Sequence, residues 1–314
     1  MSALSPHAER LAATVGLVMA NPEVIEICTN KVLTYPQAQD CGIPVMPYEI
    51  VKDLEELGNA ARRIGYPCIV KPVSERSTIC GEKAGILQSR DELGRHFETW
   101  PSGNDRLMVQ GLARGRRHNC HFLADEGRLL AYFEQAVLRT TRADGTGYGT
   151  DGVSIPPSPR LRKYCEALLM CLNYSGVGCV QFMVDGQQGD ACFLELNPRL
   201  DATCAIAVRC GYDFPLMALE YARYRRGMVS NPPRNDSTYR RRRMVWLLGE
   251  IEGLGHELHR HRLDARQAWA AFWSTVRSAL SADVHLIWSW HDPLPALHAF
   301  ARLLATILRR RAPN

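Results

Sequence analysis

Several common motifs are absent from this 314-residue sequence, and each absence excludes a class of protein. No run of eighteen apolar residues occurs, so we find no candidate membrane-spanning helix. Neither G-x-x-x-x-G-K-[ST] nor G-x-G-x-x-G after a predicted strand is present, which excludes the P-loop and the Rossmann fingerprint. H-E-x-x-H is also absent, because His256 and His259 in "GHELHRH" lie three residues apart. A solvated histidine cluster is therefore our interpretation of that segment.

A disulfide framework is not indicated, although the sequence contains eleven cysteines. The count is odd, no C-x-x-C occurs, and most cysteines lie in apolar contexts such as "YPCIVKP" and "GCVQF". Buried, reduced thiols are typical of proteins in a reducing compartment. We therefore expect a cytoplasmic protein.

The basic residues are unevenly distributed, although the net charge is only +5. Arg240 to Arg243 form one run, and Arg309 to Arg311 lie near the C-terminal end. We interpret them as a solvated basic face and expect no nucleic-acid partner. The segment "LHAFARLLATILRRR" predicts an amphipathic helix docked on the core, with its arginines at the favourable C-terminus. Weak contact with a membrane surface is the alternative.

The sequence patterns predict helices and strands in alternation over residues 31 to 227. "DLEELGNAARRIG" predicts a helix with Asp53 as its N-cap and Gly65 at its end. "VGCVQFMVD" and "ACFLELN" flank the loop "GQQGD" and predict an antiparallel pair. "SNPPRNDST" is interpreted as a linker, and the residues after it are predicted to be mostly helical.

A polar cluster interrupts the second strand of that pair, in "FLELNPRLDAT". Alternation with a period of two places Glu195 and Asn197 on one face, and Gln181 lies on the adjacent strand. Hard oxygen ligands of this kind suit Mg²⁺, which commonly takes further ligands from phosphates. Arg199 follows directly and would offset charge on a phosphoryl group. The alternative is that Glu195 and Asn197 only cap the following turn.

Upstream residues favour the metal hypothesis. Lys71 ends an apolar strand, and the loop "CGEKAGI" then provides Gly81, Lys83 and Gly85, a composition typical of a flap over phosphates. A lone lysine at a strand end is commonly a surface residue with an apolar stem. Lysines on both sides of a glycine-bearing loop, upstream of an oxygen-rich strand pair, are a stronger indication of phosphate binding.

These motifs, in the order "TNKVLTYPQAQDCGIPVMP", "GYPCIVKP", "MVQGLARG", "VQFMVD" and "FLELNPR", resemble the ATP-grasp superfamily, and most of all the ATP-grasp domain of the carbamoyl phosphate synthetase large chain. The resemblance implies an ATP-grasp fold, in which two α+β subdomains grip ATP. It implies Mg²⁺, with Mn²⁺ as an alternative, at Gln181, Glu195 and Asn197. It also implies catalytic roles for Arg199 and Lys71. It implies that the nucleotide is bound by Lys31, Lys71, Gly81, Lys83, Gln110, Gly111 and Leu112. It implies that the substrate is bound by Glu134, Arg139 and Ser154.

Two departures from the family pattern accompany the resemblance. The hinge commonly carries a glutamate where Gln110 stands, and the metal site has one carboxylate rather than two or three. We divide the chain into a short N-terminal segment, residues 1 to 30, an ATP-grasp domain, residues 31 to 230, and a mostly helical extension, residues 235 to 314. The Rossmann-like domain that usually precedes the fold is missing. We therefore consider a homodimer or a partner chain as the source of the surface that this domain would contribute to the site.

The resemblance implies an ADP-forming ligase that activates a small-molecule carboxylate as an acyl phosphate and joins it to an amine. Two alternatives stay open. One is phosphorylation of bicarbonate or carbamate, as in carbamoyl phosphate synthetase, and the other is a non-catalytic ATP-binding module.

Overall fold

The computed structural model describes residues 18 to 311 except 187–188, 236 and 261–262, together with residues 7, 10, 11 and 15. Thirteen residues of the predicted N-terminal segment, residues 1 to 30, thus lie outside the described residues. The chain divides into two compact units, residues 1–136 with 154–240, and residues 137–153 with 241–314. The predicted boundaries near residues 30 and 235 stay predictions. None of the described helices is long and apolar enough to span a membrane.

The first unit contains a four-stranded sheet in the order β1 (Tyr48–Val51), β4 (Leu107–Gly111), β2 (Cys68–Pro72) and β3 (Gly85–Leu87). Helices α4 (Leu54–Ile64) and α5 (Arg90–His96) pack beside it. The side chain of Asp53 accepts a hydrogen bond of 2.8 Å from the N–H of Glu56, and Gly65, with φ +90°, ends α4. Both helix boundaries predicted from the sequence are therefore confirmed.

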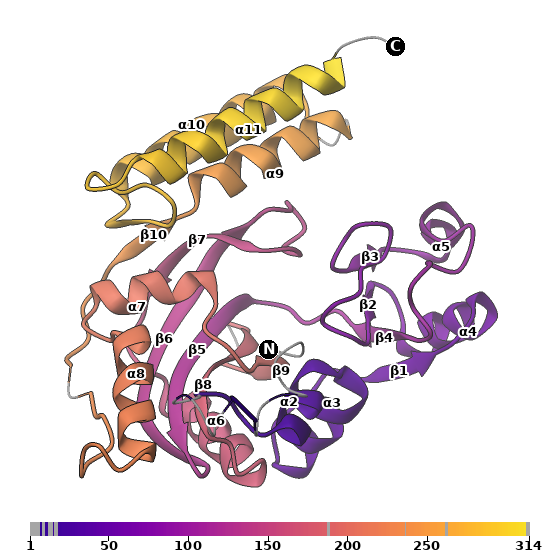
Figure 1. Cartoon of the computed structure of the whole chain (residues 1–314). Helices are drawn as coiled ribbons and strands as arrows, with labels where there is room; N and C mark the ends of the chain where they lie inside the picture. Colours follow the sequence, from indigo (N-terminus) through magenta and orange to yellow (C-terminus); the bar gives the residue numbers. More distant parts are fainter. Residues whose placement is uncertain are drawn as a thin grey trace. The chain divides into compact units, whose positions relative to one another are not determined.

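A second set of strands in this unit runs in the order β6 (Arg128–Thr140), β5 (Arg116–Asp125), β8 (Gly176–Val184) and β9 (Ala191–Asn197). All neighbours in this set are antiparallel. Helices α2 (Pro22–Thr29) and α3 (Lys31–Asp40) lie against β9 (Figure 1). Helix α6 (Pro159–Cys171) packs on β5, as does α8 (Phe214–Arg225), while η2 (Ala202–Cys204) and α7 (Ala205–Arg209) follow β9.

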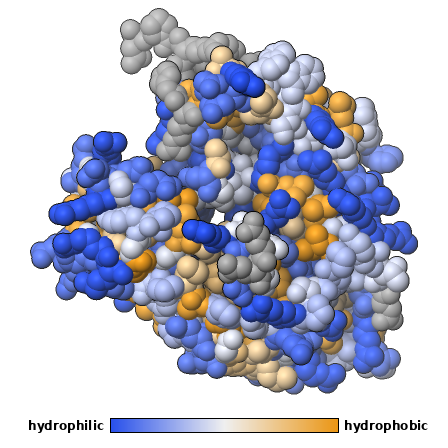
Figure 2. Space-filling view, turned by 180° about the vertical axis from the view of Figure 1, so that it is seen from behind, coloured by the Kyte–Doolittle hydropathy of each residue, from blue (hydrophilic) through white to orange (hydrophobic). Residues whose placement is uncertain are grey.

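Aromatic side chains fill the core between these strands and α3. Phe122, Phe182 and Phe193 are fully buried, and the ring of Tyr35 meets that of Phe193 edge to face at 5.5 Å. Edge-to-face pairs stabilise a core beyond the area they bury. Much of the surface seen in Figure 2 is hydrophilic, with hydrophobic residues gathered in separate patches. This core fixes α3 against β9, where the candidate site lies.

The second unit combines short strands with three helices. They are β7 (Gly149–Ser154, up to residue 153), β10 (Arg243–Val245), β11 (Val284–His285), α9 (Leu247–His259), α10 (Ala265–Ser281) and α11 (Leu294–Arg311). Asp264 and Gln267 form a reciprocal capping box at the start of α10. Helices and sheets are thus mixed throughout the described chain, which confirms the α+β prediction.

Candidate active site

The strand pair that carries the predicted metal ligands forms as expected. Gln181 on β8 lies directly opposite Glu195 on β9, and Cys179 lies opposite Asn197. The register then shifts by one residue, so that Phe182 faces Phe193. Directly paired residues share a face, so the extra residue turns Phe193 to the core and Glu195 to the other face. Irregularities of this kind are common beside active sites because they re-aim a side chain.

Tyr35 holds the irregular part of β9 in place. Its hydroxyl donates a hydrogen bond of 2.9 Å to the carbonyl of Leu194, the residue at the register shift. The same hydroxyl accepts a hydrogen bond of 3.2 Å from Nζ of Lys71. The fully buried tyrosine therefore connects α3, β2 and β9 at the site. Tyr35 was not predicted as a site residue, although its spacing of one helical turn from Lys31 places both on one face of α3.

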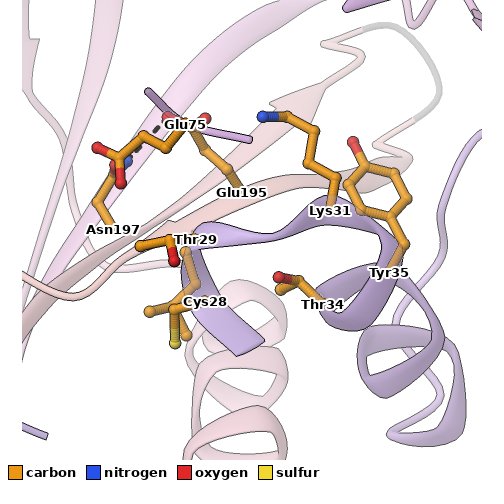
Figure 3. A pocket seen from close by; sticks show the side chains of 9 residues that line it. Cys28, Thr29, Lys31, Thr34, Tyr35, Glu75, Glu195 and Asn197 are labelled. Atoms are coloured by element: carbon orange, nitrogen blue, oxygen red, sulfur yellow. Dashed lines mark hydrogen bonds between the residues drawn. The ribbon is translucent and has the colours of Figure 1, made fainter. Parts of the chain in front are cut away.

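Glu195 lies in a cluster of opposite charges (Figure 3). Burial alone would raise its pKa, but Lys31, a hydrogen bond from Asn197, Arg117 and Lys71 together lower the pKa below the usual carboxyl value. The Asn197 bond, from Nδ2 to Oε1 of Glu195, is 2.8 Å long. Glu195 is therefore held ionised. Because the amide nitrogen of Asn197 donates to Glu195, its amide oxygen can accept a hydrogen bond or bind a cation.

The two predicted phosphate-binding lysines converge on this carboxylate. Burial lowers the pKa of Lys71 to about 8, against the opposing attraction of Glu195. Burial also lowers the pKa of Lys31, while Glu195 raises it and Lys71 lowers it further. Lys31 and Glu195 line one cavity with Glu75 and Asn197 (Figure 3). Two partly buried cations beside Glu195 leave a site that an anion would stabilise.

Arg199 lies two residues beyond the end of β9, and its predicted catalytic role stays a prediction. Its Nη2 forms an ion pair of 2.9 Å with Oε1 of Glu75, and its side chain is about half exposed. Glu75 was not among the predicted site residues, yet it lines the same cavity as Glu195. The cavity therefore holds two carboxylates rather than the one expected from the sequence, although Arg199 partly neutralises the second.

The predicted flap lies between β2 and β3, and the predicted hinge lies at the end of β4. Gly81 has φ +81°, a conformation that favours glycine, and Nζ of Lys83 donates a hydrogen bond of 3.0 Å to the carbonyl of Glu75. Lys83 is thereby connected to the site through Glu75. In the hinge, the N–H of Gly111 already donates to the carbonyl of Pro47 at 2.9 Å. Gln110 is buried within the Tyr35 hydrogen-bond network. Leu112 follows β4 directly, and the adenine contacts stay predictions.

Glu134 is buried and fully engaged by neighbouring groups. Its carboxylate accepts hydrogen bonds from the hydroxyl of Tyr132 at 3.0 Å and the N–H of Ser158 at 2.8 Å, and it pairs with Nδ1 of His118 at 2.9 Å. Ser154 likewise donates to the carbonyl of Arg240 at 2.7 Å. Glu134 and Ser154 thus have structural roles within the first unit, and their predicted contacts with the substrate stay predictions.

Arg139, the third predicted substrate residue, belongs to a charge cluster within the second unit. Its Nη2 lies 3.0 Å from Asp151 and 2.9 Å from Glu250, and it donates to Ser278 at 2.6 Å. Arg243 also pairs with Asp151, at 2.6 Å. We interpret this cluster as structural because both carboxylates are buried and each has a cation partner.

A buried polar network beside the site was not predicted. Register places Asn119 opposite both Gln181 and Gln135, and His121 opposite Cys179. These side chains therefore share the face of Glu195. Thr203 Oγ1 joins the network, accepting from Asn119 at 3.2 Å and donating to Asp201 at 2.7 Å. The alternating polar residues 117, 119 and 121 in "RRHNCHF" were the signal that could have revealed it.

The donor chemistry of the site fits Mg²⁺. Gln181, Glu195 and Asn197 offer amide and carboxylate oxygens from directly paired strands, and oxygen is the ligand atom that Mg²⁺ requires. His121, Cys179 and Asp201 form a second group of potential ligands on the same face, but its nitrogen and sulfur atoms do not suit a hard cation. The residues at Glu195 are therefore the appropriate ones for an Mg²⁺ that accompanies a nucleotide.

The fold and this site are similar to those of ATP-grasp proteins. Residues 157–225 match the family model "Carbamoyl-phosphate synthase L chain, ATP binding domain", which confirms the expected resemblance. That segment includes the strand pair with Gln181, Glu195 and Asn197.

Relatives and solved structures agree with this placement. The chain is 29% identical to the pyruvate carboxylase of Bacillus subtilis over 215 residues, covering 62% of this chain and 18% of the relative. It is 26% identical to the carbamoyl phosphate synthase large chain of Synechocystis over 241 residues, covering 71% and 21%. The biotin carboxylase of Campylobacter jejuni, solved with a β,γ-ATP compound, superposes with a TM-score of 0.58 at 18% identity, covering 70% of this chain and 52% of that one. The chain thus spans about a fifth of the length of these two sequence relatives.

Proposed function

We propose that this chain is an ADP-forming ligase, which uses ATP to activate a small-molecule carboxylate and joins it to an amine. The observation that carries the proposal is the arrangement of the partly buried Lys31 and Lys71 around the ionised Glu195. Taking cations out of water is costly unless anionic partners accompany them, and the cations Lys31, Lys71 and Arg199 outnumber the carboxylates Glu195 and Glu75. A triphosphate with its metal ion would complete the balance.

The residues then divide into three roles. Lys31 and Lys71 would hold the phosphates, and Gln181, Glu195 and Asn197 would hold Mg²⁺. When bound, Mg²⁺ would offset the negative charge of the phosphates during phosphoryl transfer. Arg199, released from Glu75, would face the phosphoryl oxygens and stabilise their charge as the substrate carboxylate attacks in line. The proposal needs no covalent bond to the protein.

The nucleotide contacts are assigned by position. Gly81 and Lys83 would cover the phosphates, and Gln110, Gly111 and Leu112 would border the adenine. The buried network of Asn119, Gln135 and Thr203 adjoins the metal ligands and offers polar atoms to the acceptor side. Direct contact with the substrate would require Glu134, Arg139 and Ser154 to exchange their intramolecular hydrogen bonds and ion pairs for bonds to the substrate.

This function can be tested by measuring ADP release from ATP in the presence of a panel of small carboxylates and amines. ADP that appears only when one acid and one amine are both present supports the ligase. AMP in place of ADP contradicts it, because an acyl phosphate leaves ADP. ATP binding without any release of ADP would indicate a non-catalytic module.

A second candidate is phosphorylation of bicarbonate or carbamate. It is supported by the sequence relatives, which are named as a carboxylase and a carbamoyl phosphate synthase. Release of ADP with bicarbonate alone distinguishes it from the ligase. A second copy or another chain is proposed as the source of any further protein surface that the site requires. A cytoplasmic location likewise stays a proposal.

A further inference from the structure

Helix α10 has its polar side buried and its apolar side exposed. Thr275 and Ser278 are buried, and they donate hydrogen bonds to Glu250 at 3.1 Å and Asp151 at 3.0 Å. The helix therefore docks on its own unit through small hydroxyl side chains. Surface helices commonly show the opposite arrangement, with the apolar stripe against the core.

The outward side of α10 carries large apolar side chains. Trp269, Phe272, Trp273 and Leu280 are 63%, 44%, 51% and 84% exposed. With 3.6 residues per turn they fall, together with Val276, within an arc of about 100°. The rings of Trp269 and Phe272 stack at 6.1 Å, and Trp273 meets both edge to face. We call these five residues the α10 face. Continuous apolar patches of this kind mark interaction surfaces.

Tryptophan and positive charge are concentrated in the same part of the chain. Residues 241–314 contain five of the six tryptophans. They also contain eleven arginines against six acidic residues, whereas the rest of the chain has twenty-seven residues of each sign. The net charge of +5 thus belongs to this segment. Arg266 and Arg277 are exposed and border the α10 face, and residues 265–281 include no acidic side chain.

We propose that the α10 face binds the surface of an anionic membrane. Tryptophan rings favour the boundary between headgroups and acyl chains, and flanking arginines are attracted by anionic headgroups. No described helix could span a bilayer, so the contact is with the surface only. A second copy of the chain fits less well, because pairing two basic faces brings like charges together. The proposal does not depend on the ligase function.

Co-sedimentation with lipid vesicles tests the proposal on the full chain. We expect binding to vesicles with about one third phosphatidylglycerol and at least about tenfold weaker binding to pure phosphatidylcholine, since each basic residue near an anionic surface adds about fivefold in affinity. The Trp269→Ser, Trp273→Ser double variant should lose at least about tenfold, because it removes two interfacial anchors. Leu219→Ser is the matched control, as Leu219 is 59% exposed on α8 of the first unit, and it should bind as the parent does.

Three results would overturn the proposal. One is an absence of binding to anionic vesicles by a protein with a native circular dichroism spectrum. Another is equal loss in the double variant and in Leu219→Ser. The last is a mass in solution that doubles with concentration and is reduced by the double variant, without vesicle binding, which would make the α10 face an interface between copies.

Discussion

The hydroxyl of Tyr35 donates a hydrogen bond of 2.9 Å to the carbonyl of Leu194, at the one-residue shift in the pairing of β8 and β9. This bond joins helix α3, which carries Lys31, to the strand that carries Glu195. The shift turns Glu195 away from the core face of Phe193. The hydrogen bond of Tyr35 therefore helps to set the position of the Glu195 carboxylate relative to Lys31.

Removing this hydroxyl should loosen the site. In Tyr35→Phe the carbonyl of Leu194 loses its partner, and we expect the free energy of unfolding to fall by about 1 to 3 kcal/mol. Denaturant titration measures this loss. Tyr48→Phe is the control, because its hydroxyl bonds Gln39 at an exposed position and its removal should cost less than about 0.5 kcal/mol. Equal effects in both variants would contradict the role assigned to Tyr35.

Nucleotide binding should take up protons. Burial lowers the pKa of Lys71 to about 8, so at pH 8 about half of the free sites hold a neutral amine. The phosphates of ATP favour the charged form, so binding restores the proton, and affinity should fall as pH rises through 8. Calorimetry in two buffers of different ionisation enthalpy measures the uptake. Lys71→Met should reduce the uptake, and an unchanged value would place the titrating group elsewhere.

Arg139 should affect stability more than catalysis. Arg139→Ala leaves the buried Glu250 without its arginine, and we expect a loss of about 3 kcal/mol in the free energy of unfolding. Arg162→Ala removes an arginine of an exposed pair with Glu166 and should cost about 0.5 kcal/mol or less. A stable Arg139→Ala protein with a raised KM for the acid would instead support the substrate contact expected from the sequence.

Much of this fold could be predicted from local signals. Asp53 and Gly65 fixed the ends of α4, and the spacing of Gln181 and Glu195 around a five-residue loop predicted their pairing. The register shift at Leu194 could not be predicted, because alternation alone places Phe193 and Glu195 on the same face. Tyr35, Glu75 and the Asn119 network were missed for a related reason. Their roles depend on contacts between elements distant in sequence, which no local pattern encodes.

Arg199 should act on the chemical step. In Arg199→Ala the charge that would face the phosphoryl oxygens is lost, and we expect kcat to fall about 100 to 1000 fold with little change in the KM for ATP. Arg225→Ala is a suitable control, because Arg225 pairs with Asp125 at the surface of the same unit. Steady-state ADP release measures both variants. A rise in the KM for ATP at constant kcat would assign Arg199 to nucleotide binding instead.

The central claim is that Glu195 holds the metal ion that accompanies ATP, while Lys31 and Lys71 hold the phosphates. ATP affinity measured with Mg²⁺ and with a chelator separates the two contributions. For the parent protein we expect Mg²⁺ to increase affinity at least about tenfold, as for a carboxylate that binds the cation together with phosphates. Glu195→Gln should lose this increase yet still bind ATP in the chelator, because both lysines are retained. Glu55→Gln, at an exposed position of α4, should behave as the parent, and a full Mg²⁺ effect in Glu195→Gln would contradict the account.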